Sequence, residues 1–258
     1  MEMYIQGRTR LKGEVEISTS KNAILPIIAA TVLTDEKVVL KRVPRIKDVD
    51  TICQILQQLG KEIQVKDDYL VFNSRVLQTT PPYDLVRQMR ASFLLMGALL
   101  SRCGKVRVSL PGGCAIGNRP IDLHLKGFAA MGAEIKFNGG DVIAKANKLT
   151  GNHIYLDFPS VGATENIMMA ASLADGTTWI ENAALEPEIV DLANFINMMG
   201  GHVNGAGTNV IKIQGVDLLS GTEYTPIPDR IEAGTYLIAV AATAGEAVIK
   251  NVIPEHVK

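Results

Sequence analysis

Residues 111–120 read PGGCAIGNRP, a glycine-rich segment with a proline at each end and one cysteine, Cys114. A lone cysteine in such a segment is a candidate catalytic thiol. The same composition is also typical of a wide turn without chemistry. The elements around the segment therefore have to decide between the two interpretations.

Those elements form a repeat. Three predicted helices are each followed by a glycine and a short strand, at Gly60, Gly132 and Gly200, the pattern of a helix that ends in a glycine cap. An apolar helix and a strand precede each of these three helices. A fourth copy of the apolar helix and strand, YLIAVAATAGEAVIKNV, lies near residue 258. We predict α/β modules of strand, helix, strand, helix, strand and strand, each about 70 residues long, with three complete and half of a fourth.

The spacing between modules places Cys114 at an insertion. The three glycines are 72 and then 68 residues apart, whereas the strands before them begin 68 and then 72 residues apart. The second module therefore gains four residues between its halves, inside PGGCAIGNRP. Insertions in repeat architectures collect on loops, often on the working face.

Equivalent helices begin with groups that can bind anions. Lys21 and Asn22 begin the first helix, Arg90 lies at the start of the second, and Ser160 precedes the third. Hydroxyl caps at such positions are expected to leave helix amides free for a phosphate or carboxylate, and the repeat should aim them at one centre. A solvated helix start and a surface cation remain the alternatives for Lys21, Asn22 and Arg90. Pro26 is expected to kink or delay the first helix.

Composition excludes several classes of protein. Hydrophobic residues make up 47% of the chain, charged residues 21%, and the net charge is -1, which favours neither nucleic-acid binding nor disorder. No apolar run is long enough to span a bilayer and the first residues lack a signal-peptide core, so we expect a cytoplasmic protein. Cys53 and Cys103 are expected to be packing residues, and neither cysteines nor histidines show metal-ligand spacing.

Several segments together resemble the UDP-N-acetylglucosamine enolpyruvyl transferases, also called UDP-N-acetylglucosamine 1-carboxyvinyltransferases, of the EPSP synthase-like superfamily. The resemblance covers the whole chain and rests on TSKNA (19–23), RQMRASFLLMGALL (87–100), PGGCAIGNRPIDLHL (111–125), PSVGATEN (159–166), EPEIVDLANF (186–195) and PDRIEAGTY (228–236).

The family fold implies an inside-out α/β barrel domain built from repeated βαβαββ modules with helices in the core. Residues 1–20 would then belong with a second domain, residues 21–228 would form a three-module domain carrying the cysteine loop, and residues 229–258 would begin the second domain. The family has six modules, so the resemblance implies a truncated chain that is poorly active alone. Asp229-Arg230 would be either a simple helix start with a weak ion pair or a hinge between the domains.

The implied reaction transfers enolpyruvyl from phosphoenolpyruvate to the 3-hydroxyl of UDP-N-acetylglucosamine and releases phosphate, the first committed step of peptidoglycan synthesis and the target of fosfomycin. No cofactor and no metal are implied. By resemblance, Cys114 protonates the vinyl methylene from a lid loop, and Arg119 holds the phosphate and favours the thiolate. Lys21 and Arg90 complete the anion clamp. The general base would be an aspartate beyond residue 258.

The same resemblance implies which residues bind the nucleotide sugar. Its expected contacts are Asn22, Lys47, Asp122, Leu123, His124, Ser160, Val161 and Gly162. The sequence departs from many relatives at Asp157-Phe158-Pro159, where a lysine is usual.

Three other functions stay open. A binding module without chemistry would keep the helix-terminus anion sites but would not need Cys114. A non-catalytic fragment of the enzyme would end as this sequence does. Transfer to shikimate 3-phosphate is disfavoured because that family lacks the cysteine loop.

Overall fold

The fold was examined in a computed structural model, which describes residues 2–4, 7, 9–110 and 121–258. The predicted modules follow one another along the chain. The first contains β1 (Lys12–Glu16), α1 (Lys21–Ala30), η1 (Thr31–Leu33), β2 (Val38–Lys41), α2 (Lys47–Gln58), β3 (Glu62–Lys66) and β4 (Tyr69–Asn73). The second contains α3 (Tyr83–Val86), η2 (Arg90–Leu94), α4 (Leu95–Cys103), β5 (Lys105–Ser109), α5 (Asp122–Ala130), β6 (Glu134–Asn138) and β7 (Asp141–Lys145). The third contains β8 (His153–Tyr155), α6 (Val161–Ala171), β9 (Thr177–Glu181), α7 (Pro187–Met198), β10 (His202–Asn204) and β11 (Val210–Gln214). The partial fourth contains β12 (Glu223–Tyr224), α8 (Arg230–Ala242), β13 (Glu246–Lys250) and η3 (Pro254–Val257).

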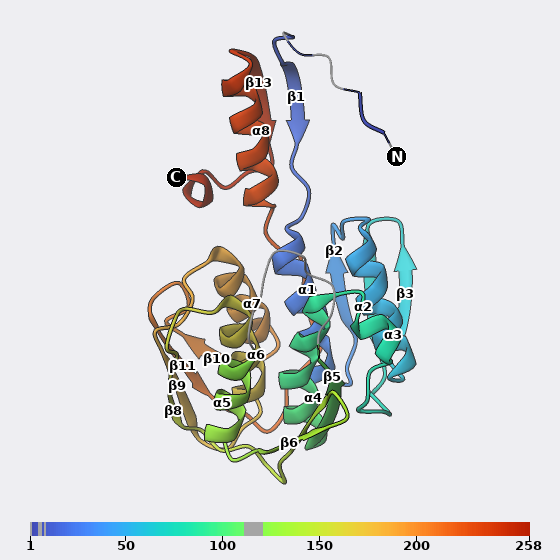
Figure 1. The fold of residues 1–258 in the computed structure, drawn as a ribbon, viewed down its shortest axis with the longest axis vertical. Coiled ribbons are helices and arrows are strands. Elements are labelled where there is room, and N and C mark those ends of the chain that lie inside the picture. Colours follow the sequence, from blue (N-terminus) through green and yellow to red (C-terminus); the bar gives the residue numbers. More distant parts are fainter. Residues whose placement is uncertain (1, 5–6, 8, 111–120) are drawn as a thin grey trace.

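The inside-out arrangement is confirmed. Every residue from Ala23 to Ala30 in α1 and from Ala163 to Ala171 in α6 is buried, and α4 is buried from Leu95 to Leu100. A helix that is apolar all round belongs in a core. These helices lie between the sheet of β8–β11 and the sheet that holds β2, β3 and β4 (Figure 1).

The glycine caps are also confirmed. Gly60, Gly132 and Gly200 follow α2, α5 and α7 with φ of 105°, 90° and 94°. This left-handed backbone favours glycine, which has no Cβ to clash with the neighbouring carbonyl. Each cap turns the chain from an outer helix into the next strand of its sheet.

The second module departs from the prediction, because α3 stands where its first strand was expected. Pro81 and Pro82 lie at that place, and proline cannot donate to a strand ladder. Pro82 is instead the N-cap of α3. One hydrogen bond of the expected strand remains, from the Arg107 N–H to the Thr79 carbonyl at 3.0 Å. The sheet of this module consequently has three described strands, in the order β5-β7-β6.

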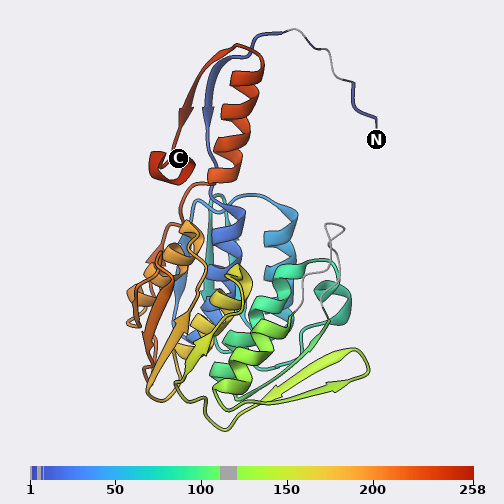
Figure 2. The same ribbon diagram turned by 60° about the vertical axis from the view of Figure 1, so that its left-hand side comes forward.

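Modules one and four exchange their first strands. In the third module β8 pairs with its own β9 in parallel, whereas β1 pairs with β13 and β12 pairs with β2, also in parallel. The chain therefore crosses twice between the main body and the unit of β1, α8 and β13, which projects from it (Figure 2). The crossings lie side by side, since the Ser20 N–H donates to the Ile227 carbonyl at 2.9 Å and the Asp229 N–H to the Ser18 carbonyl at 2.9 Å. The division at residues 20 and 228 into parts of two domains stays a prediction.

Candidate functional site

The N-termini of α1, η2 and α6 meet at one cavity of about 840 Å³. Seven of the predicted site residues line it: Lys21, Asn22, Arg90, His124, Ser160, Val161 and Gly162. A hollow of about 910 Å³ on the outer face of the sheet of β2, β3 and β4 holds none of them. The repeat thus brings equivalent helix ends from three modules to a common centre.

The other predicted residues are placed differently. Lys47 lines a neighbouring cavity of about 310 Å³, which Lys21 also touches. Leu123 was expected at the nucleotide sugar, but its side chain is 3% exposed and packs in the hydrophobic core, because it faces inward from α5. Asp122 is exposed at the start of α5 and does not line the cavity. Cys114 and Arg119 lie outside the described residues.

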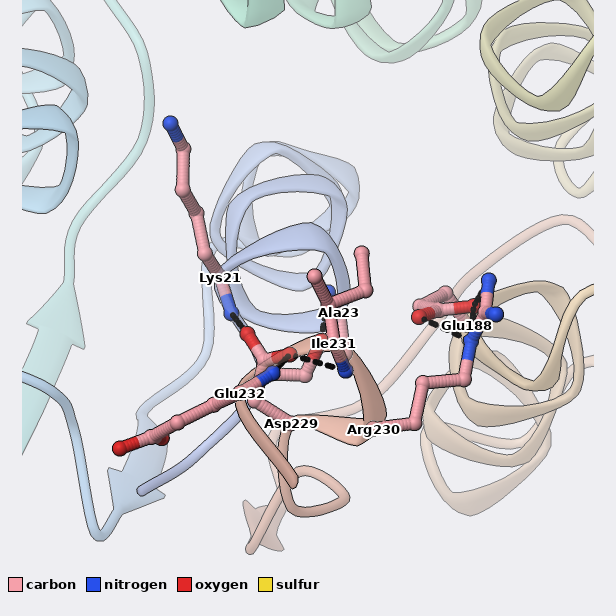
Figure 3. Close-up of polar contacts among 8 residues, drawn as sticks. Lys21, Ala23, Glu188, Asp229, Arg230, Ile231 and Glu232 are labelled. Carbon is pink, nitrogen blue, oxygen red and sulfur yellow. Dashed lines mark hydrogen bonds and ion pairs between the residues drawn. The ribbon is translucent and has the colours of Figure 1, made fainter. Parts of the chain in front are cut away.

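Lys21 is held by two carboxylates. Its ammonium lies 2.5 Å from Asp48 Oδ2. Its backbone N–H donates to Asp229 Oδ2 at 3.2 Å (Figure 3). Ser20 caps the helix by accepting from the Ala23 N–H at 3.3 Å. The expectation that the first-turn amides of α1 are free is therefore wrong for two of them. The side chains of Asp229 and Ser20 already accept hydrogen bonds from the N–H groups of Lys21 and Ala23. What α1 offers the cavity is chiefly the side chains of Lys21 and Asn22.

Pro26 neither delays nor ends α1, which begins at Lys21 and continues to Ala30. A proline inside a helix lacks the N–H that would bond to the carbonyl four residues earlier. That carbonyl belongs to Asn22, and both residues line the cavity. The proline therefore leaves the Asn22 carbonyl without its usual intrahelical donor beside the cavity.

His124 is a buried imidazole at the edge of the cavity. It is 7% exposed, stands edge-on to Phe93 with ring centroids 5.2 Å apart, and its Nδ1 lies 2.9 Å from Asn166 Nδ2. Burial, with a smaller contribution from the positive charge of Arg90, lowers the pKa of His124 to about 4. At neutral pH it can serve as a hydrogen-bond partner but not as a cation.

The third helix end presents backbone amides. Ser160 Oγ accepts from the Ala163 N–H at 3.4 Å, and within the described part of the chain no acceptor is recorded for the N–H groups of Val161 and Gly162. Such amides at a helix N-terminus favour an anion. Just before this helix end, Asp157 pairs with Lys126 of α5 at 2.9 Å.

Sequence reasoning missed Glu165, which lines the same cavity. Its side chain is 3% exposed, and Oε1 has no hydrogen-bond partner among the described groups. Burial, together with the charges of Glu188 and Glu186, raises the pKa of Glu165 well above 4.5. The only signal in the sequence is the polar pair Glu165-Asn166 directly before the apolar run IMMAA, at positions that the helix buries.

The residues described contain no group of three or more metal-ligating side chains, and none of their helices is long and apolar enough to cross a membrane. Cys53 is 7% exposed in the core, where burial raises the pKa of its thiol to about 12, and Cys103 is half-buried against the core. Both therefore have the packing role expected of them.

The family model described as EPSP synthase (3-phosphoshikimate 1-carboxyvinyltransferase) matches residues 5–258. The chain belongs to the EPSP synthase family. Among curated relatives of this family member, "UDP-N-acetylglucosamine 1-carboxyvinyltransferase 1" of Caldanaerobacter subterraneus subsp. tengcongensis is 55% identical, over 96% of this chain and 60% of the relative. "UDP-N-acetylglucosamine 1-carboxyvinyltransferase 2" of Carboxydothermus hydrogenoformans is 56% identical, over 99% of this chain and 62% of the relative. The chain thus spans about three fifths of the length of these relatives.

Solved structures of the family agree on the fold. The enolpyruvyl transferase NikO from Streptomyces tendae superposes with a TM-score of 0.81 at 25% identity, over 91% of this chain and 56% of that one. EPSP synthase from Acinetobacter baumannii gives a TM-score of 0.74 at 18% identity, over 94% of this chain and 56% of that one. The α/β fold expected from the resemblance is thereby confirmed.

Proposed function

We propose that this chain forms the cysteine-loop part of an enzyme that transfers enolpyruvyl from phosphoenolpyruvate to the 3-hydroxyl of UDP-N-acetylglucosamine, the first committed step of peptidoglycan synthesis. The observation that carries the proposal is the identity above 50% with relatives named for this reaction, over almost the whole chain. The cavity supports it, because cations from α1 and η2 face the amides of α6 across a space suited to a substrate with several anionic groups.

In the proposed reaction the oxygen of the 3-hydroxyl bonds to C2 of phosphoenolpyruvate, its proton passes to the general base, and another proton adds to C3. The bond from C2 to the phosphate oxygen then breaks with release of phosphate, and a base removes a proton from C3 to restore the double bond. Lys21 and Arg90 would stabilise the carboxylate and phosphate charge. Cys114 would give the proton to C3 and Arg119 would hold the phosphate, both from the segment outside the described residues.

The nucleotide sugar would lie along the α6 end of the cavity. The open amides of Val161 and Gly162, with Ser160 beside them, suit its diphosphate. His124 would donate to an oxygen of the same ligand and Asn22 would orient the sugar. Lys47 would act from the neighbouring cavity. For Asp122 and Leu123, only backbone contacts would fit the proposal, given where their side chains lie.

We further propose that groups from the additional length of the relatives complete the site, including the general base. The apolar helix α8 supports this, because among its described residues only Ala233 is buried, and Ile238 is 72% exposed. Its counterparts α1, α4 and α6 are core helices. An exposed apolar helix of this kind is typical of a surface that another part of a protein covers. We therefore expect the 258-residue chain to turn over poorly by itself.

The test is mass spectrometry after incubation with the epoxide phosphonate fosfomycin, with and without UDP-N-acetylglucosamine. We expect one adduct, on Cys114, that forms faster with the nucleotide sugar. Cys114→Ser is the control for the site and Arg90→Gln, which should slow labelling, the control for the anion clamp. Labelling spread evenly over the cysteines, or no labelling, would contradict the proposal. Acceleration by shikimate 3-phosphate instead of UDP-N-acetylglucosamine would favour the other enolpyruvyl acceptor.

A further inference from the structure

Asn166 is a fully buried polar side chain at the junction of three helices. It lies on α6 and is 0% exposed. Its Oδ1 accepts from the Gly97 N–H at 2.7 Å, and its Nδ2 donates to the Phe93 carbonyl at 3.0 Å and lies 2.9 Å from His124 Nδ1. One carboxamide therefore connects η2, α4 and α5.

The orientation of this carboxamide is fixed by the backbone. A backbone N–H only donates and a carbonyl only accepts, so Oδ1 must face Gly97 and Nδ2 must face Phe93. The second hydrogen of Nδ2 then points to His124 Nδ1, which has to accept it. Since a neutral imidazole carries one N–H, the proton of His124 lies on Nε2.

That Nε2 atom lies beside the first turn of α6. A Cβ added to Gly162 would be 3.5 Å from Nε2 and 3.2 Å from Cε1 of His124. Both residues line the cavity. The Nε2–H is thus placed with the open amides of Val161 and Gly162, where three N–H donors can serve the oxygen atoms of one ligand.

The same carboxamide also interrupts a helix. Phe93 and Gly97 are four residues apart, so in a continuous α-helix the Gly97 N–H would donate to the Phe93 carbonyl. Both groups bond to the Asn166 carboxamide instead. The chain is a 3₁₀ helix up to Leu94 and an α-helix from Leu95. Arg90 is the first residue of that 3₁₀ segment.

We propose that Asn166 is a positioning residue, which presents the His124 Nε2–H to an oxygen acceptor in the cavity and holds the turn that begins with Arg90. Only the identity of the ligand in this inference rests on the proposed function. The tautomer and the helix interruption depend on this chain alone.

The direct test is long-range ¹H–¹⁵N NMR of the imidazole rings at pH 7. The chain has four histidines, and His124→Gln assigns the signal of His124. We expect the wild-type spectrum to show Nε2 protonated and Nδ1 unprotonated. In Asn166→Asp a carboxylate faces Nδ1, so Nδ1 should become protonated. A wild-type His124 with its proton on Nδ1, or an Asn166→Asp spectrum like that of the wild type, would overturn the inference.

Asn197→Asp is the matched control. Asn197 likewise holds a backbone pair, accepting from the Val203 N–H at 2.7 Å and donating to the Val203 carbonyl at 2.9 Å, but it does not line the cavity. The His124 signal should be unchanged in this variant. The wild-type spectrum tests the tautomer even if Asn166→Asp does not fold.

Calorimetric titration with UDP-N-acetylglucosamine tests the positioning role separately. Asn166→Asp and the uncharged Asn166→Leu should each bind about tenfold more weakly, the value of one ordered hydrogen bond, and Asn197→Asp should bind as the wild type does. Unchanged affinity in Asn166→Leu would overturn the positioning role. A wild-type chain that binds no nucleotide sugar would count against the proposed function, while the NMR result would still decide the tautomer.

Discussion

Asp229 Oδ2 accepts a hydrogen bond from the backbone N–H of Lys21 at 3.2 Å, although the two residues are 208 positions apart (Figure 3). Asp229 Oδ1 meanwhile accepts from the N–H groups of Ile231 at 2.8 Å and Glu232 at 3.0 Å. One carboxylate thus caps α1 of the main body and α8 of the projecting unit. The next residue, Arg230, pairs with Glu188 Oε1 at 3.0 Å, and the Glu188 side chain is 2% exposed. This partly buried contact is more than the weak surface ion pair considered from the sequence.

Asp229→Ala should lower the free energy of unfolding by about 1–2 kcal/mol, because two helix N-termini lose their acceptor. Urea titration measures the loss. Asp217→Ala, at an exposed position, is the control and should change stability by less than about 0.5 kcal/mol. Equal effects of the two substitutions would show that the shared cap contributes nothing.

Gly97→Ala should destabilise the protein by about 1–3 kcal/mol through overpacking. An added Cβ would lie 2.2 Å from the Asn166 backbone oxygen and 2.5 Å from its Oδ1, and α6 is buried and cannot yield easily. The matched substitution is Gly234→Ala in α8, where a Cβ meets nothing within 4 Å. It should stabilise the protein by up to about 1 kcal/mol, because alanine is the better helix former. Thermal unfolding of both variants distinguishes these outcomes, and a neutral Gly97→Ala would contradict the close contact.

Glu165→Gln should become more stable relative to the wild type as the pH rises from 5 to 8. Burial raises the pKa of Glu165 in the folded protein, so its carboxyl holds the proton to higher pH than in the unfolded chain, which releases it above about 4.5. The unfolded state then binds fewer protons, so each pH unit costs the wild type up to about 1.4 kcal/mol, a cost that glutamine does not have.

Urea unfolding across this pH range measures the difference between the variants. Glu62→Gln, on the exposed face of β3, provides the comparison and should keep a constant difference from the wild type. A constant difference for Glu165→Gln as well would mean that its carboxyl is ionised in the folded protein.

Tyr224→Phe should lower the free energy of unfolding by about 1–3 kcal/mol at pH 7.5, because a buried carboxylate loses a donor. Tyr224 on the exchanged strand β12 donates to Asp191 Oδ1 at 2.6 Å, and Asp191 Oδ2 accepts from the Ile227 N–H at 3.1 Å. The hydrogen bond from Tyr224 to Asp191 connects β12, which pairs with β2 of the first module, to α7 of the third module. Tyr155→Phe, at a 56% exposed tyrosine, should be nearly neutral in the same denaturation assay. Similar losses of unfolding free energy in both variants would show that the hydrogen bond to Asp191 does not contribute to stability.

Much of the candidate site could be predicted from the sequence. The periodic apolar runs and the glycines after α2, α5 and α7 are local signals, since each depends on the backbone preferences of a few adjacent residues. The repeat then implied that the helix ends with Lys21, Arg90 and Ser160 would face one centre, and the cavity contains all three.

Tertiary structure decided which strands pair and which polar groups are buried. Nothing in the local sequence of β1 or β12 distinguishes pairing within a module from the exchange that occurs, because parallel partners are chosen by contacts between distant segments. The burial of Glu165 and the three hydrogen bonds of Asn166 likewise arise only when α4, α5 and α6 pack together. The polar pair Glu165-Asn166 before an apolar run shows which groups are present, but the three hydrogen-bond partners of Asn166 come from η2, α4 and α5 of the second module.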